Sequence, residues 1–195
     1  AGLVIGLVVL YVMQPPWWPA PWQGIARFLS ANLSRPDTKP IPTMYLGTVY
    51  GFSLPWHNTL VLTAVTVPTL VLGFGALGII ASVLRFRTDR EPLIWVLSWS
   101  VLMVVRALPA APGHDGTRQF LPSIVTLAVL AGLGAEWLRA RCQVLRISWL
   151  ATVLAAFAVA ESLIGIVWLY PYTLSYYNIA VGNLRGAERD GFELT

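Results

Sequence analysis

The chain has 195 residues, of which 56% are hydrophobic and only 11% are charged. A soluble domain carries about 25% charged residues, so the composition excludes an ordinary soluble domain, and it also excludes a mainly disordered chain. The formal net charge of +4 is typical of loops that set membrane topology, and there is no basic, aromatic-rich run of the kind that binds nucleic acid. The single cysteine, Cys142, excludes an internal disulfide and a cysteine-based metal site. The sequence therefore predicts an all-α integral membrane protein.

Five apolar blocks follow one another along the chain. Residues 1–13 are too few for a full crossing, which needs about 20 apolar residues, and we interpret them as part of a span. Four full transmembrane helices are expected, over 59–84, 93–108, 120–138 and 147–169. Because residue 1 is Ala rather than Met, residues 1–195 are expected to be a single membrane-domain piece of a longer protein.

Residues 22–33 predict a further helix of a different kind. Their apolar side chains recur at helical spacing, while polar side chains fill the other positions. The apolar members are Ile25, Phe28, Leu29 and Leu33. This pattern indicates an amphipathic helix lying in the membrane interface, although a helix packed on neighbouring spans has the same pattern.

The glycines at 73, 75 and 78 form a GxGxxG string inside the expected span 59–84. No strand precedes the string, so it does not predict a nucleotide-binding loop. Small residues at this spacing let helix backbones approach one another. We therefore expect close helix packing here.

The distribution of arginine predicts the orientation. The short loops 85–92 and 139–146 hold six arginines in 16 residues, whereas the loops 14–58 and 109–119 hold four basic residues in 56 positions. By the positive-inside rule, the two arginine-rich loops are cytoplasmic. The loop 14–58, the loop 109–119 and the tail 170–195 then share the extracytoplasmic face, and strict alternation of four spans gives the same result.

The predicted extracytoplasmic loop 112–118 lies between two apolar segments and contains a cluster of ionisable side chains. His114, Asp115 and Arg118 lie within five residues of one another. Arginine offers a rigid fork of donors that matches phosphate oxygens, while Asp and His can bind hydroxyl groups or a cation. Flanking glycines let the backbone turn closely around a ligand. The alternative is a tight turn in which Asp115 and Arg118 pair and cap the following helix.

Two other polar stretches lie on the same predicted face. One precedes the span at 59 and the other follows the span that ends at 169. Their candidate substrate-binding residues are Tyr45, Trp56, His57, Tyr176, Tyr177 and Asn178. Interface anchoring is the stronger interpretation of each aromatic residue taken singly, but it does not explain Asn178.

Two ionisable residues fall inside the expected spans. Arg106 lies near the extracytoplasmic edge, from which its side chain can reach the interface. Glu161 lies deeper, where burial favours the neutral form unless the carboxylate finds a partner. A structural partner, a protonated hydrogen bonder and a proton relay are the three readings of Glu161.

Taken together, residues 45–56, 112–122, 170–178 and 186–192 resemble the GT-C membrane glycosyltransferases of the protein O-mannosyltransferase and aminoarabinose-transferase type. The resemblance covers most of the chain from about residue 17 and places it in the C-terminal part of the membrane domain. It implies transfer of a sugar from a polyisoprenyl-phosphate donor to an acceptor, such as a protein in protein glycosylation, at the extracytoplasmic face of a bacterial inner membrane. The acidic catalytic base of such enzymes lies in a loop that is not within these residues.

On this resemblance, Arg118 would hold the donor phosphate, while His114 and Asp115 would orient the sugar or the acceptor. Lipid-linked donor and membrane lipids are the expected partners. No nucleotide cofactor is implied, and a divalent cation is compatible with the chemistry although no cluster of ligands in the sequence points to one. The alternatives are a segment of a secondary transporter, which would have polar or unwound positions at mid-depth in paired spans, and a purely structural membrane subunit.

Overall fold

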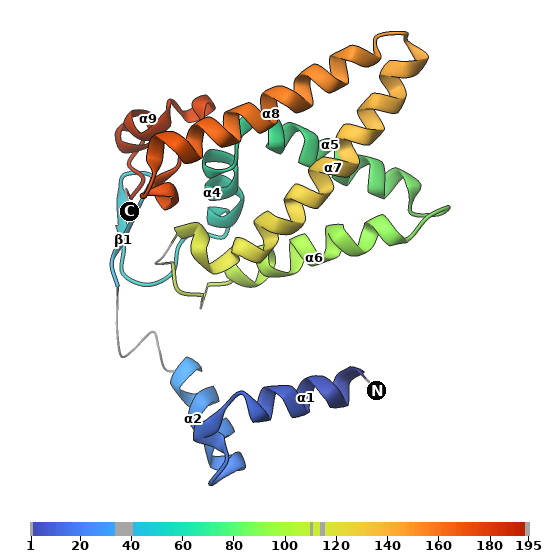
Figure 1. Cartoon of the computed structure of the whole chain (residues 1–195). Coiled ribbons are helices and arrows are strands. Elements are labelled where there is room, and N and C mark those ends of the chain that lie inside the picture. The colour runs from blue at the N-terminus through green and yellow to red at the C-terminus, as the bar shows by residue number, and fades with distance from the viewer. Residues whose placement is uncertain (1, 34–40, 110, 114–115, 194–195) are drawn as a thin grey trace. The chain divides into compact units, whose positions relative to one another are not determined.

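The computed structural model describes residues 2–33, 41–109, 111–113 and 116–193, and these are mostly helical (Figure 1). The chain divides into two compact units, Ala1–Ile41 and Pro42–Thr195. The expectation of one membrane domain stays a prediction, and each unit is described by itself.

The first unit contains two helices joined by an aromatic and proline-rich turn. Helix α1 spans Gly2–Val12, the 3-10 helix η1 spans Pro15–Trp17, and α2 spans Pro21–Leu33. The Trp18 indole donates a hydrogen bond to the carbonyl of Tyr11 (3.0 Å), and the Trp17 ring meets Phe28 edge-on with 5.8 Å between centroids. The predicted helix over 22–33 is confirmed, and its position in a membrane interface stays a prediction.

The second unit begins with a short hairpin that the all-α prediction did not include. Strands β1 (Thr43–Tyr45) and β2 (Thr48–Tyr50) pair in antiparallel fashion. Leu46 and Gly47 form the two-residue turn, and both have positive φ, as a tight hairpin turn of this hand requires. Strand-forming Thr, Tyr and Val on either side of a Leu-Gly pair were the signal for it.

Helices make up most of the second unit. Their bounds are α4 Asn58–Thr66, α5 Thr69–Arg85, α6 Glu91–Arg106, α7 Leu121–Val144, α8 Ser148–Leu169 and α9 Asn183–Arg189. Short 3-10 helices precede α7 (η2, Gly116–Phe120) and connect α8 to α9 (η3, Thr173–Ser175; η4, Ile179–Val181). Two of the described helical segments are long and apolar enough to cross a membrane, Gly116–Val144 and Trp149–Leu169.

The helix expected over 59–84 is interrupted, and its crossing of a membrane stays a prediction. The helix stops at Thr66 and resumes at Thr69, and Val67 adopts an extended conformation between them. Pro68 is the cause, because proline has no N–H to donate and its ring pushes the preceding residue out of the helical region. The expected span 93–108 forms the 16-residue helix α6.

Helix α7 is longer than the expected span 120–138 and continues to Val144. Most of the arginine-rich loop 139–146 is therefore helical. Glu136 and Arg139 form an ion pair at 2.7 Å, one turn apart on the surface of α7, and Arg141 lies over the ring of Trp137. These contacts extend the helix beyond its apolar part.

Glycines bring α5 and α7 into backbone contact. A Cβ atom at Gly78 would overlap the carbonyl of Leu130, and one at Gly134 would overlap the carbonyl of Phe74. A Cβ atom at Gly75 would lie 2.7 Å from Leu127, whereas Gly73 has no neighbour within 4 Å. Close packing is thus confirmed for Gly75 and Gly78, and Gly73 is not part of the contact.

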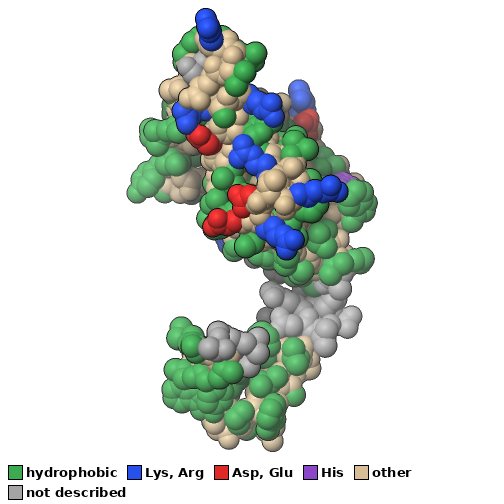
Figure 2. Space-filling view, turned by 90° about the vertical axis from the view of Figure 1, so that its right-hand side faces the viewer, with side chains coloured by type: hydrophobic (Ala, Val, Ile, Leu, Met, Phe, Trp, Pro, Cys, Tyr) green, Lys and Arg blue, Asp and Glu red, His purple; other side chains and the backbone are tan. Residues whose placement is uncertain are grey.

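The two arginine-rich turns lie at one end of the second unit, and the hairpin, η2 and α9 lie toward the other (Figure 1). Figure 2 faces the arginine-rich end and shows basic side chains gathered there, over the turns that join α5 to α6 and α7 to α8. The two arginine-rich turns therefore share one end of this unit, while their orientation toward a membrane stays a prediction.

We expect Gly78→Leu to destabilise the protein by about 3 kcal/mol, because no rotamer can relieve an overlap with helix backbone. Gly73→Leu is the matched control and should change stability by no more than about 1 kcal/mol, since its site is open and leucine favours helix. Thermal unfolding of the detergent-purified variants measures both. Equal midpoints for the two variants would contradict the backbone contact between α5 and α7.

Candidate functional site

Three stretches that are far apart in the sequence share one hydrophobic core. The cluster contains side chains from the hairpin and the segment that follows it, from helices α4 and α6, from η2 and from the tail. Its buried members are Tyr45, Leu54, Leu62, Met103, Phe120, Tyr177, Ala187 and Phe192. The regions 45–57, 112–120 and 170–192, which the sequence singled out separately, are therefore parts of one structure.

The loop that enters η2 is fixed against the segment following the hairpin. The amide of Gly113 donates to the carbonyl of Phe52 (2.6 Å), and a Cβ atom at Gly113 would lie 2.5 Å from Leu54 Cγ. The Arg106 guanidinium donates to the carbonyl of Pro112. Arg118 lies in η2, two residues before the buried Phe120. His114 and Asp115 fall outside the described residues.

The tail is joined to the hairpin on its other side. The amide of Gly47 donates to the carbonyl of Gly191 (3.0 Å), and Phe192 meets the ring of Tyr45 edge-on at 5.9 Å. Tyr177 packs against Phe192, and its hydroxyl donates to the carbonyl of Glu193 (2.8 Å). The hairpin thus links the predicted loop region with the tail.

Tyr45 and His57 form a hydrogen-bonded pair at this end of the unit. The Tyr45 hydroxyl lies 2.9 Å from His57 Nδ1. Burial raises the pKa of Tyr45 to about 12, with a smaller contribution from nearby Tyr50, so the phenol stays neutral at physiological pH. Trp56 is 71% exposed and stands edge-on to the His57 ring. Of these three residues, Trp56 offers the most surface to a ligand.

Asn178 closes one half of the α4–α5 break. Its side chain is 0% exposed, and its amide nitrogen donates to the carbonyls of Ala64 (2.7 Å) and Val67 (2.8 Å). Its backbone amide donates to the carbonyl of Val65 (2.8 Å). These are carbonyls that a continuous helix would have satisfied itself. The structure therefore gives Asn178 a role in holding the break, while contact with substrate stays a prediction.

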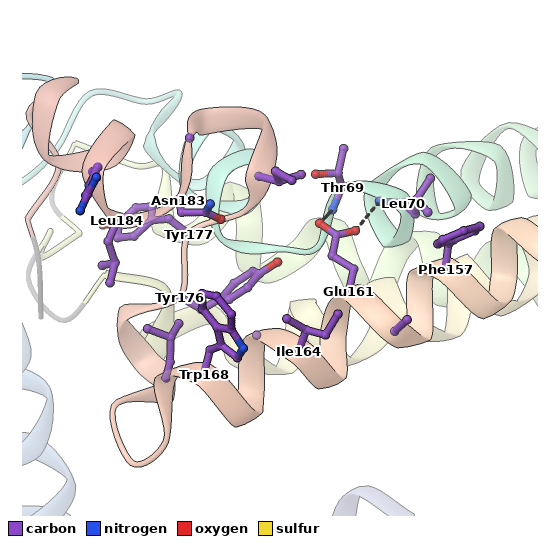
Figure 3. A pocket seen from close by; sticks show the side chains of 16 residues that line it. Thr69, Leu70, Phe157, Glu161, Ile164, Trp168, Tyr176, Tyr177, Asn183 and Leu184 are labelled. Atoms are coloured by element: carbon purple, nitrogen blue, oxygen red, sulfur yellow. Dashed lines mark hydrogen bonds between the residues drawn. The ribbon is translucent and has the colours of Figure 1, made fainter.

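Glu161 closes the other half of the break. Its carboxylate accepts hydrogen bonds from the backbone amides of Thr69 (2.9 Å) and Leu70 (3.3 Å), the first residues of α5 (Figure 3). Burial, followed by the charge of nearby Glu161, raises the pKa of Tyr176 to about 12. A carboxylate at a helix N-terminus is favourable because it meets free N–H groups and the positive end of the dipole. Of the three interpretations of Glu161, the structure supports a structural role, in which the carboxylate is bonded to the start of α5.

A groove of about 960 Å³ runs between α8 and the tail (Figure 3). The α8 residues that line the groove recur at helical spacing, so they lie on one face of the helix. The largest members of this wall are Phe157, Ile164, Trp168 and Leu169, and the tail wall includes Ile179 and Leu184. Glu161 and Tyr176 lie at its base, and Arg185 lines it from α9.

Sequence reasoning singled out Glu161, Tyr176 and Tyr177 but not the rest of the groove. Helix α8 is apolar on all sides. The sequence therefore does not distinguish the face that lines the groove from the opposite face. Arg185 stands in a polar stretch shortly after a predicted span, and this position is the signal that could have identified it. Among residues 2–33, 41–109, 111–113 and 116–193, no group of three or more His, Cys, Asp or Glu side chains could hold a metal ion.

The fold and site together define a mostly helical protein with two helices long and apolar enough to span a membrane and a largely apolar groove beside α8. The chain matches no protein-family model, and comparisons with curated proteins and with solved structures found no match.

We expect Asn178→Asp to cost about 2–4 kcal/mol of stability. The change keeps the shape of the side chain but removes both hydrogen bonds that the amide nitrogen donates. A carboxylate oxygen then faces two buried carbonyls. Each buried carbonyl left without a donor costs about 1–3 kcal/mol. Asn183→Asp is the matched control, because Asn183 is exposed, and should stay within about 0.5 kcal/mol. Chemical or thermal unfolding measures the difference, and a mild effect at Asn178 would contradict its role at the break.

Proposed function

We propose that the chain is part of an integral membrane glycosyltransferase of the GT-C type, which moves a sugar from a polyisoprenyl-phosphate donor to an acceptor at the extracytoplasmic face. The observation that carries this proposal is the shared core of residues 45–57, 112–120 and 170–192. These are the stretches on which the family resemblance rests, and a site assembled from all three needs them at one end of the helices. Their meeting in space supports reading them as one site.

The proposed topology has four crossings, in a bacterial inner membrane. In it α4 and α5 together form one crossing that is interrupted at Pro68, and α6, α7 and α8 form the others, while α2 lies in the interface. The arrangement of the arginine-rich turns at one end of the unit supports this topology. The polar loops then face the compartment where lipid-linked sugars are used.

In the proposed reaction, Arg118 binds the donor phosphate and the exposed Trp56 packs against a sugar face. Arginine suits this role because its planar fork can make two hydrogen bonds to one phosphate. His114 and Asp115 are proposed to orient the sugar or acceptor. The chemistry needs a base to activate the acceptor, and we propose that an acidic residue beyond these 195 positions supplies it.

A segment of a secondary transporter is the second candidate, and the α4–α5 break favours it. Such proteins place discontinuous helices and ionisable residues at mid-depth, as Pro68 and Glu161 would be in the proposed topology. Two observations weigh against this candidate. The groups freed at the break are bonded by Asn178 and Glu161, and α6, α7 and α8 continue without interruption.

The role of Arg118 can be tested by Arg118→Lys. An ammonium group cannot reproduce a two-pronged contact, so we expect transfer per folded molecule to fall by roughly ten- to hundredfold, the range for a hydrogen bond to a charged group. Activity is measured with a lipid-linked sugar donor in membranes that contain the complete protein.

Arg90→Lys, in an exposed turn at the arginine-rich end, provides the control and should keep full activity. If Arg118 only stabilises the start of α7, Arg118→Lys and Arg118→Ala will lower stability by about 1 kcal/mol and leave turnover of the folded fraction intact. That result would remove Arg118 from the site.

The orientation can be tested with introduced cysteines. Cys142 itself is buried and would react slowly on either side, so it is replaced by Ala. Val144→Cys, at a position 82% exposed next to the arginine-rich turn, should react with a membrane-impermeant thiol reagent only after cells are permeabilised. Tyr172→Cys, at a position 74% exposed in the tail, should react in intact cells. The reverse pattern would overturn the proposed orientation.

A further inference from the structure

We propose that the groove between α8 and the tail binds the isoprenyl chain of the donor, with Arg185 contacting its phosphate. This inference rests on the proposed function, because that function supplies the class of lipid. It adds a second phosphate contact and a place for the apolar chain, neither of which follows from the loop 112–118.

The shape of the groove suits one extended apolar chain. Its α8 wall is a single stripe of the helix from Phe157 to Leu169, which is about 18 Å long at about 1.5 Å per residue. The facing wall is formed by Thr69 and Leu70 at the start of α5 and by a segment of the tail that includes Ile179. Phe157, Ile164 and Ile179 are all largely exposed, so the groove is open along its length and a chain can enter from the side.

The polar groups at the base of the groove do not interrupt its apolar lining. The Glu161 carboxylate is turned toward α5, where the backbone amides of Thr69 and Leu70 donate to it (Figure 3). The ring of Tyr176 lies against the backbone of Gly165, where a Cβ atom would come within 2.5 Å of it. The side of this polar cluster that faces the groove is therefore largely carbon.

Charge distinguishes one end of the groove. Arg185 is exposed and makes no ion pair with any described residue, whereas its neighbour Arg189 is paired with Asp190 at 3.1 Å. An unpaired guanidinium beside an apolar groove complements a ligand with one anionic head and one long apolar chain. A polyisoprenyl monophosphate has this chemistry, and its single chain fits a groove one stripe wide.

The test measures binding of a long-chain polyisoprenyl monophosphate to the purified protein by native mass spectrometry. Ile164→Trp fills the groove and should weaken binding by about tenfold or more, since a built-in clash rejects the chain. Val167→Trp is the matched control on the same helix, because Val167 is 72% exposed and does not line the groove; its affinity should equal that of the wild type. Arg185→Gln should weaken binding about two- to fivefold, and less at high salt.

Ile179→Asn, on the tail wall, replaces Ile164→Trp if that variant does not fold, and should also weaken binding. If the wild type binds the lipid and both wall variants bind it equally well, the groove is not the binding site, while the proposed function stays in place. Equal affinity for phosphatidylglycerol would show a groove for phospholipid and would also overturn the inference. If the wild-type protein binds no polyisoprenyl monophosphate, the proposed function fails together with it.

Discussion

The structure depends on how the backbone groups freed at Pro68 are satisfied. Breaking a helix inside an apolar environment leaves carbonyls on one side and N–H groups on the other, and each costs free energy if it stays unpaired. Asn178 supplies donors to the carbonyls of α4, and Glu161 supplies an acceptor to the amides of α5. One residue comes from the tail and the other from α8, so the break ties both to the α4–α5 segment.

This arrangement also shapes the groove. Because Asn178 is drawn into the break, the preceding Tyr176 is held against Gly165 and Glu161 on α8. The tail therefore runs beside α8 rather than away from it, and the space between them becomes the groove. The same hydrogen bonds that stabilise an interrupted helix thus create the surface that we propose for the lipid chain.

A second constraint is the contact between α5 and α7. Glycines at 75, 78 and 134 let the two backbones touch, and this packs the helix that follows the break against the longest helix of the unit. Where side chains cannot separate the helices, small changes in volume are poorly tolerated. The N-terminus of α5, with its amides bonded to Glu161, begins on this tightly packed helix.

The sequence by itself determined the helical character and the helices over 22–33, 120–138 and 147–169, because these follow from local composition and periodicity. It did not determine that 59–84 is interrupted, although Pro68 is visible in it, since proline can kink a helix or break it according to what satisfies the freed groups. Only the tertiary structure supplied Asn178 and Glu161 as those partners, more than 90 residues away. It alone also defined the groove, because an evenly apolar helix such as α8 carries no sign of which face will meet the tail.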